Sequence, residues 1–268
     1  RQHRIPAPIW NEFINRAAAA RLTPAAALLT LYGKVVERWG SGSGFTMNVP
    51  LFNRAGVGPA LADVVADFTS LVMVQITPDA TTGLAEEVRR VQCALHEAIS
   101  HDAYSGVDVQ RSWLREHPGQ RTMAPVVFSC NIGVELFSPL FTEAFGQMGF
   151  MVSQTPQVWL DFQLFTVDGE LLLIWDAVEQ LFHPEVLDAM FTAFVESVTA
   201  ACAPDFSWSQ PLEIVIDEML QVRAALCSPP MPLSCETIHE PVFAQALRCP
   251  EAPALIDGRS GETTTRAE

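Results

Sequence analysis

The sequence predicts a layered α/β fold. Some segments repeat apolar residues at helical spacing, other segments rich in β-branched residues alternate polar and apolar positions, and the two kinds are interspersed along the chain. The 268 residues are 49% hydrophobic and 18% charged. This length and composition predict one substantial hydrophobic core and a small additional unit.

The N-terminal part predicts two helices followed by two strands. A helix is expected over residues 8–20. Thr23 is a suitable N-cap for a second helix with Pro24 at its first position, and a glycine-serine run at 40–44 ends that helix. Leu28, Leu31, Val35 and Trp39 would form its apolar face. Strands are expected at residues 45–51 and 68–76.

The middle of the chain alternates helices and strands. Residues 84–100 form a strongly amphipathic pattern, and a shorter helix is expected at 107–116. Strands are then expected at 126–132, 158–165 and 171–175, with an Asp168-Gly169 turn between the last two. A helix begins near Pro184.

The composition changes after Ala201, where prolines and serines become frequent. A helix is expected at 212–226, a proline-rich linker at 228–232 and a short helix at 238–247, whereas 258–268 has no core-forming pattern. We therefore divide the chain into a main lobe at residues 1–201, a connecting helix and linker at 202–236, and the beginning of another domain at 237–268.

Charge and composition exclude several classes of function. A net charge of −15 argues against nucleic acid and anionic membrane surfaces as partners. No apolar stretch is long enough to cross a bilayer and no secretion signal is evident, so we expect a cytoplasmic protein. The six cysteines lack metal-ligand spacing, which predicts reduced structural thiols and no metal site.

Three predicted strands carry polar residues on one face. Because side chains alternate with period two, Asn48 lies opposite Met47, Ser129 and Asn131 lie opposite an apolar set, and so do Asp161 and Gln163. Such faces are often exposed to solvent. Alternatively they line a polar cleft, where Val127 and Trp159 would lower the dielectric constant around Asp161 and raise its pKa. The pattern alone leaves both interpretations open.

Several segments resemble the heterocyclization domains of nonribosomal peptide synthetases. The chain reads FTMNVPLFNR at 45–54, ADFTSL at 66–71, PVVFSC at 125–130 and SQTPQVWLD at 153–161, followed after thirteen intervening residues by WD at 175–176. These are similar to the family's FTLNxxLFxR, (G/A)DFTxL, PVVFTS and (S/T)QTPQVxLD motifs, and residues 23–39 resemble its Ala/Leu-rich helix ending in Trp. The matches follow the family's order.

The resemblance implies a fold like chloramphenicol acetyltransferase, a two-layer sandwich in which two similar lobes form a V around a tunnel. This chain would be the second lobe, and the first lobe, which carries the family's DxxxxD signature, would precede it. Residues 238–257 look like the start of an adenylation domain. A lobe on its own is expected to be inactive, because it supplies only half of the tunnel.

The resemblance also implies the chemistry. A carrier-bound acyl thioester would condense with carrier-bound Cys, Ser or Thr, and cyclodehydration would give a thiazoline or oxazoline. Asp161 would transfer protons, Ser129 would orient it or the reacting oxygen, and Asn48 would hydrogen-bond the developing oxyanion. The expected substrate contacts are Gln157, Asn131 and Gln163.

Other positions within the matching segments are expected to be structural. Asp67 and Thr69 would shape a turn, Tyr104 and Ser105 would begin a helix, and Trp175-Asp176 would anchor a strand end. At position 129 the family motif has Thr, so this chain keeps the hydroxyl and loses a methyl group.

The expected partners are the first lobe, the upstream and downstream peptidyl carrier proteins and the adjacent adenylation domain. No cofactor is expected in the lobe itself, because phosphopantetheine arrives on the carrier proteins. Two alternatives stay open at this point: an ordinary amide-forming condensation domain, and a docking lobe without catalytic activity.

Overall fold

The computed structural model describes residues 1–40, 44–52, 64, 66–118, 124–134, 137–146, 149–183, 185–214, 240–258 and 260–266. The chain divides into two compact units, Arg1–Ile216 and Asp217–Glu268. The predicted linker at 228–232 lies outside the described residues, as does most of the predicted helix at 212–226; residues 212–214 are not helical. The domain boundaries proposed above stay a prediction.

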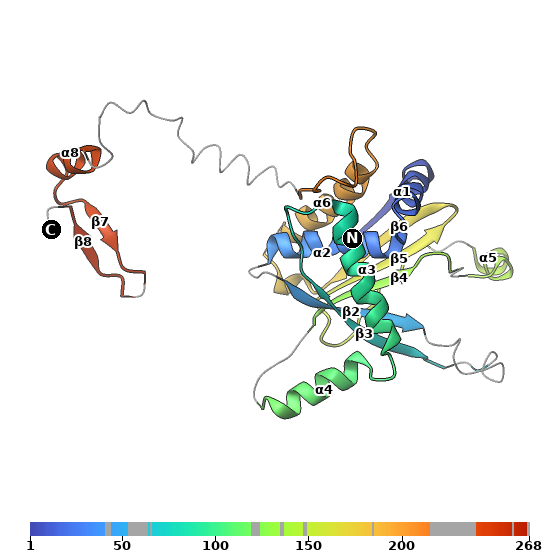
Figure 1. Cartoon of the computed structure of the whole chain (residues 1–268). Helices are drawn as coiled ribbons and strands as arrows, with labels where there is room; N and C mark the ends of the chain where they lie inside the picture. Colours follow the sequence, from blue (N-terminus) through green and yellow to red (C-terminus); the bar gives the residue numbers. More distant parts are fainter. Residues whose placement is uncertain are drawn as a thin grey trace. The chain divides into compact units, whose positions relative to one another are not determined.

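The first unit is built on a six-stranded mixed sheet (Figure 1). Its strands follow the order β1-β6-β5-β4-β2-β3, in which β4 runs parallel to β2 and to β5, and the remaining neighbours are antiparallel. The strands are β1 (Gln2–Ile5), β2 (Phe45–Phe52), β3 (Thr69–Ile76), β4 (Val126–Asn131), β5 (Leu160–Val167) and β6 (Glu170–Ala177).

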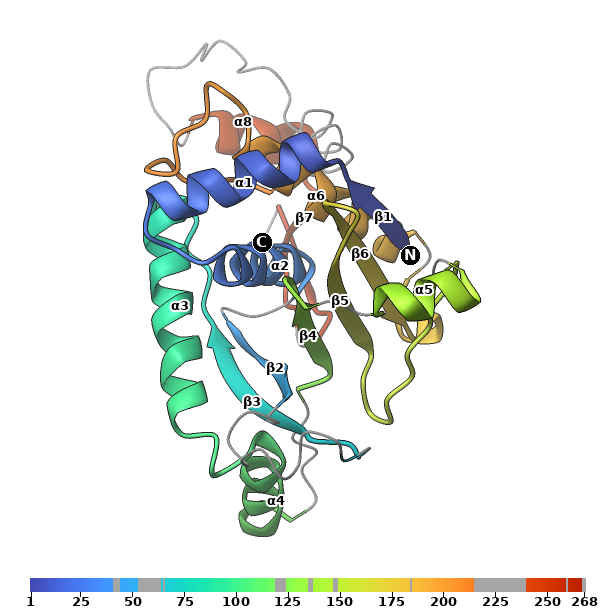
Figure 2. The same cartoon turned by 90° about the vertical axis from the view of Figure 1, so that its right-hand side faces the viewer.

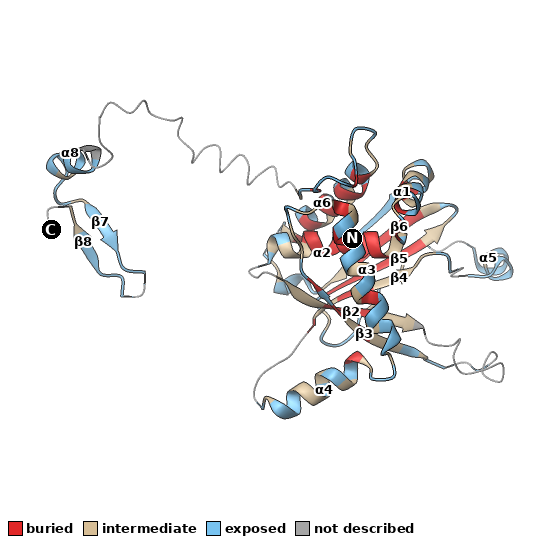
Figure 3. Cartoon of the chain, viewed as in Figure 1, coloured by how far each residue is buried: buried red, intermediate tan, exposed pale blue. Residues whose placement is uncertain are grey.

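Four helices form a layer against one face of this sheet (Figure 2). They are α1 (Ala7–Ala19), α2 (Pro24–Trp39), α3 (Leu84–Ser100) and α6 (Val186–Ala201). Helix α4 (Gly106–Glu116) packs near β3, and α5 (Pro139–Phe145) lies between β4 and β5 in the sequence. The predicted α/β layered fold is therefore confirmed, and Figure 3 shows its buried residues concentrated in the sheet and the inner helices.

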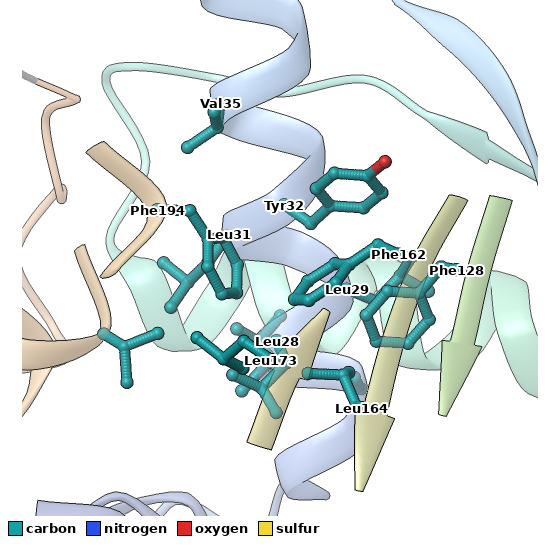
Figure 4. Packing of buried hydrophobic residues seen from close by; sticks show 14 of the residues in the cluster. Leu28, Leu29, Leu31, Tyr32, Val35, Phe128, Phe162, Leu164, Leu173 and Phe194 are labelled. Carbon is teal, nitrogen blue, oxygen red and sulfur yellow. The ribbon is translucent and has the colours of Figure 1, made fainter. Parts of the chain in front are cut away.

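Helix α2 lies at the centre of the core. Thr23 caps it by accepting a hydrogen bond from the Ala26 backbone, as predicted. The sequence predicted that only one face of α2 is buried. The buried part is larger, because every residue from 26 to 35 is buried between the sheet and the other helices. Tyr32 packs edge-to-face on Phe162, with ring centroids 4.8 Å apart, and Phe194 packs on the same ring (Figure 4).

A buried ion pair ties α2 to α3. The Lys34 ammonium lies 2.7 Å from the Glu87 carboxylate, and the two side chains are 6% and 2% exposed. The second Glu87 oxygen accepts a hydrogen bond from the Asp79 backbone at 2.8 Å. A charged residue within each helix is therefore accommodated because its partner comes from the other helix.

Several local predictions are confirmed and several elements were missed. The Asp168-Gly169 turn has positive φ at both residues and joins β5 to β6. Neither β1 nor α5 was predicted, and the predicted strand at 158–165 begins two residues before β5. Strand β1 is short and its first three residues are exposed, so its pattern carries little signal.

The second unit contains α8 (Glu240–Arg248) and a hairpin of β7 (Pro253–Ile256) and β8 (Thr263–Thr265). The short helix was predicted, but the tail was not expected to form a strand; β8 consists of threonines, which favour strands without adding an apolar face. Among the described residues, no helix is long and apolar enough to span a membrane.

Candidate functional site

A pocket of about 950 Å³ lies on the sheet face opposite the helical layer. Its floor is formed by the polar faces of β2, β4 and β5. The start of β3, helix α4 and the segment at residues 151–158 form its walls. The pocket exists because β5 and β4 carry apolar side chains toward α2 and polar side chains away from it.

All six side chains predicted from the sequence line this one pocket. They are Asn48 on β2, Ser129 and Asn131 on β4, Gln157 in the segment before β5, and Asp161 and Gln163 on β5. The alternative of a solvent-exposed polar face is wrong, because Asn48, Asp161 and Gln163 are only 7–8% exposed. Buried polar groups at this density point to a binding surface.

Asp161 is the main ionisable group of the pocket floor. Its Oδ2 accepts a hydrogen bond from the Gln163 amide at 3.1 Å, while its Oδ1 is buried and accepts none from the described residues. Burial raises the pKa of this carboxyl to about 6, with a further contribution from the neighbouring Asp176; the Gln163 and Ser153 side chains act in the opposite direction. Near neutral pH this group therefore exchanges protons readily.

The neighbours of Asp161 differ from those expected. Trp159 precedes the strand and its side chain is 39% exposed, so it does not enclose the carboxyl; Val127, 7% exposed and directly opposite on β4, does. In the parallel register Ser129 pairs with Gln163 and not with Asp161. The two residues share a face of the sheet, but the hydrogen bond to the carboxylate comes from Gln163.

Asp176, which the sequence predicted to be a strand anchor, is also a direct neighbour of Asp161. It lies directly opposite Asp161 across the β5–β6 hairpin. Its Oδ2 accepts hydrogen bonds from the Ser153 backbone at 2.7 Å and from the Gln163 amide at 3.3 Å. The two-residue turn at Asp168-Gly169 fixes the hairpin register, so this pairing could have been read from the sequence.

The Asn48 side chain is held by a hydrogen bond to the backbone just before β4. Its Nδ2 donates to the Ala124 carbonyl at 2.8 Å, and its Oδ1 is buried without a partner among the described residues. A buried amide oxygen without a donor is energetically unfavourable, which suits an atom that meets a ligand.

The segment before β5 is shaped by local geometry. Gln157 adopts φ of 70°, a left-handed conformation that is uncommon for a residue with a side chain. The Trp159 backbone then donates to the Pro125 carbonyl at 2.8 Å, which joins this segment to the start of β4. The 153–161 motif thus both forms a wall of the pocket and leads the chain into β5.

Residues expected to be structural have that role and also border the pocket. Asp67 Oδ1 accepts a hydrogen bond from the Thr69 backbone at 2.9 Å, as a turn former does. Ser105 caps α4 in a reciprocal arrangement with Asp108. Within the described ranges, no group of His, Cys, Asp and Glu side chains is arranged to hold a metal ion.

The chain is similar in sequence to two curated proteins. It is 39% identical over 245 residues to "Phenyloxazoline synthase MbtB" of Mycolicibacterium paratuberculosis, covering 91% of this chain and 21% of that protein. It is 38% identical over 242 residues to "Pyochelin synthetase PchE" of Pseudomonas aeruginosa, covering 90% and 17%. The chain thus spans about a fifth of the length of these relatives. No protein-family model matches it.

Solved structures share the fold. The EpoB cyclization-docking bidomain from Sorangium cellulosum superposes with a TM-score of 0.68 at 31% identity, covering 78% of this chain and 42% of that one. The nonribosomal peptide synthetase FmoA3 matches 100% of this chain and 30% of its own, with a TM-score of 0.76 and 31% identity. The first condensation domain of the CDA synthetase, at 16% identity, shares the fold with a TM-score of 0.60.

Proposed function

Because this chain resembles the heterocyclization domains of nonribosomal peptide synthetases in sequence and in fold, we propose that it forms the second lobe of such a domain. The pocket on the polar face of the sheet would then be its side of the reaction chamber. The observation that carries this proposal is one buried carboxyl on the pocket floor, Asp161, whose Oδ1 has no hydrogen-bond partner in the described part of the chain and whose pKa is raised to about 6.

The reaction would proceed in two stages. The amine of a carrier-bound Cys, Ser or Thr attacks a carrier-bound acyl thioester, which forms an amide and releases the thiol of the donor's phosphopantetheine arm. The side-chain thiol or hydroxyl then adds to the amide carbon, and loss of the former carbonyl oxygen as water leaves a thiazoline or oxazoline ring.

Asp161 would serve the second stage. As a carboxylate it accepts the proton of the attacking thiol or hydroxyl, and as an acid it protonates the departing oxygen. With a pKa of about 6, both forms are populated near neutral pH. The second hydrogen of the departing water comes from the amide N–H, whose loss forms the C=N bond of the ring, so the carboxyl ends in its starting state.

The neighbouring polar groups would orient the substrate. Ser129 would hydrogen-bond the reacting oxygen, since its hydroxyl shares the pocket floor with Asp161. The Asn48 amide would contact the developing tetrahedral centre. Gln157, Asn131 and Gln163 would position the rest of the substrate.

The partners would be those of a synthetase: a first lobe that completes the chamber, carrier proteins that bring the phosphopantetheine arms, and an adenylation domain beginning near residue 237. The last assignment is supported by the match of the whole chain to FmoA3, which has been solved with alpha-methyl-L-serine-AMP bound. Cyclization is favoured over simple condensation because identity to the cyclization bidomain is 31%, against 16% for the condensation domain.

The test uses this chain assembled into a complete two-lobe domain with loaded carrier proteins. Mass spectrometry of the carrier-bound product distinguishes the amide from the ring, which has lost one water. Asp161→Asn should reduce ring formation at least about 100-fold and leave amide formation within about threefold, because an amide side chain cannot transfer the proton. Ser129→Ala should slow the same stage less severely.

Asp168→Asn is the matched control, because it removes one carboxylate from the same hairpin at an exposed turn. Wild-type protein that releases only the amide would identify a condensation domain, and no product at all would favour a docking lobe. Normal cyclization by the Asp161→Asn variant would refute the role given to Asp161.

A further inference from the structure

Two carboxyl groups, one of them on the pocket floor, are linked by one amide. Asp161 on β5 and Asp176 on β6 are directly opposite each other in the hairpin register. The Nε2 of Gln163 donates to Oδ2 of both, at 3.1 Å and 3.3 Å. An amide nitrogen carries two hydrogens, so it can serve both acceptors at once.

The two carboxyl groups are not equivalent. Asp176 is half-buried, and its Oδ2 accepts a second hydrogen bond, from the Ser153 backbone at 2.7 Å. Asp161 is 8% exposed, and its Oδ2 accepts the Gln163 hydrogen bond. Two neighbouring carboxylates resist being ionised together, so Asp176 favours the protonated form of Asp161 and contributes to its raised pKa.

The hydrogen bonds also distinguish the two oxygens of the Asp161 carboxyl. Oδ2 accepts the Gln163 amide hydrogen, whereas Oδ1 is buried and has no partner among the described residues. When Asp161 is protonated, Oδ1 is therefore the oxygen left to carry the proton.

We infer that Asp176 is a positioning residue: through the Gln163 amide it fixes the orientation of the Asp161 carboxyl on the pocket floor. This inference rests on the proposed function for its role in cyclodehydration. There the carboxyl accepts the proton of the attacking thiol or hydroxyl and passes it to the former carbonyl oxygen, and the amide N–H supplies the second hydrogen of the departing water. Asp176 touches neither the substrate nor the reacting atoms.

The other ionisable groups near Asp161 do not replace Asp176. Tyr32 reaches the sheet from α2, and burial raises its pKa well above the usual value, so the phenol stays neutral. On the pocket wall the pKa of Asp67 is lowered by its hydrogen bonds to Thr69, so it stays ionised. Arg111, on α4, also lines the pocket and pairs with Asp108 at 3.7 Å.

The direct test follows the Asp161 carboxyl carbon by NMR in the 268-residue chain labelled with ¹³C at aspartate, with the signal assigned from the Asp161→Asn spectrum. Asp176→Asn should move the titration midpoint of Asp161 down by about one pH unit, because a like charge is removed. Asp176→Glu keeps the charge and should leave the midpoint nearer to wild type. Asp168→Asn, in the same hairpin, should not move it.

Gln163→Leu provides an independent measurement with the opposite sign. It removes the hydrogen bond that favours the carboxylate form, so the Asp161 midpoint should rise. An unchanged or raised midpoint in a folded Asp176→Asn variant would overturn the inference. If the Asp176→Asn variant did not fold, an unchanged Asp161 midpoint in Gln163→Leu would overturn the inference instead.

In the complete domain, the acid limb of the pH profile for ring formation should move in the same direction as each midpoint, while the profile for amide formation stays in place. A purely structural role of Asp176 would reduce both stages equally and shift neither limb. The titration needs no turnover, so it tests the role of Asp176 even if the wild-type protein forms no ring. Failure to form a ring would refute only the proposed function.

Discussion

At the scale of single residues, the pocket contains an ionisable group, Asp161, whose burial destabilises the folded state. Asp161 has a pKa of about 6 in the fold and an ordinary value of 3.8. Between these values the folded chain binds more protons than the unfolded chain, so stability falls as pH rises through this window. The loss amounts to about 3 kcal/mol and is complete above pH 6.

Asp161→Asn should therefore increase the free energy of unfolding at pH 7, by up to about 3 kcal/mol, because no charge is then buried. The gain should vanish near pH 3.5, where the carboxyl is protonated in both states. Urea unfolding at the two pH values measures this difference. Asp168→Asn, at an exposed position, should show no such pH-dependent gain, and equal stability of wild type and Asp161→Asn at pH 7 would contradict the burial of an ionisable group there.

At the scale of elements, the helical layer is completed by the segment that follows α6. The first backbone amides of α3, at Leu84 and Ala85, donate to the carbonyls of Gln210 and Trp208 at 2.9 and 2.7 Å. These bonds satisfy donors that a helix start leaves unpaired. Gly83 is the N-cap, and a Cβ at this position would meet the Ser209 carbonyl oxygen at 2.3 Å.

Gly83→Ala should therefore destabilise the fold by about 1–3 kcal/mol, because a backbone carbonyl has to move and the bonds to α3 weaken. Its own φ of −61° is accessible to alanine, so the effect is steric. Chemical denaturation gives the size of the change. Gly149→Ala is the matched control, since its Cβ meets nothing within 4 Å and stability should change by less than about 0.5 kcal/mol. Similar values for both variants would contradict this packing.

The β5–β6 hairpin shows how an element creates a site. A two-residue turn sets the register, and that register brings two carboxyls separated by fourteen intervening residues to directly opposite positions. A shift of one residue would turn Asp161 toward Tyr32 and the aromatic core. The turn is therefore as important for the chemistry as the residues in the pocket.

At the scale of the whole molecule, the described core belongs to the first unit. The buried cluster runs from Ile5 to Leu212 and includes no residue of the unit at Asp217–Glu268. The first unit is thus expected to unfold in one cooperative transition.

Removal of residues 217–268 should accordingly leave the Tm of the first unit within about 2 °C, because no described core contact is lost. Scanning calorimetry of the full and shortened chains provides the comparison. A fall of more than about 5 °C on shortening would mean that the second unit contributes to the first unit's stability.

The sequence by itself determined most helices and strands, the polar face of each strand, and the family that these motifs resemble. These are local properties, because helix caps, turns and the period of side-chain direction depend on residues close in sequence. Asp161, Ser129 and Asn48 could be placed on polar faces for this reason. The same local signal was too weak for β1, which is short and largely exposed.

Only the tertiary structure decided which faces meet. The parallel pairing of β4 with β5 sets Ser129 beside Gln163 and Val127 beside Asp161, and the helical layer buries α2 on all sides. These outcomes depend on strand order and on contacts between distant segments, which local periodicity does not contain. The burial that raises the Asp161 pKa is likewise a property of the assembled pocket, since desolvation arises only when the surrounding strands and loops exclude water.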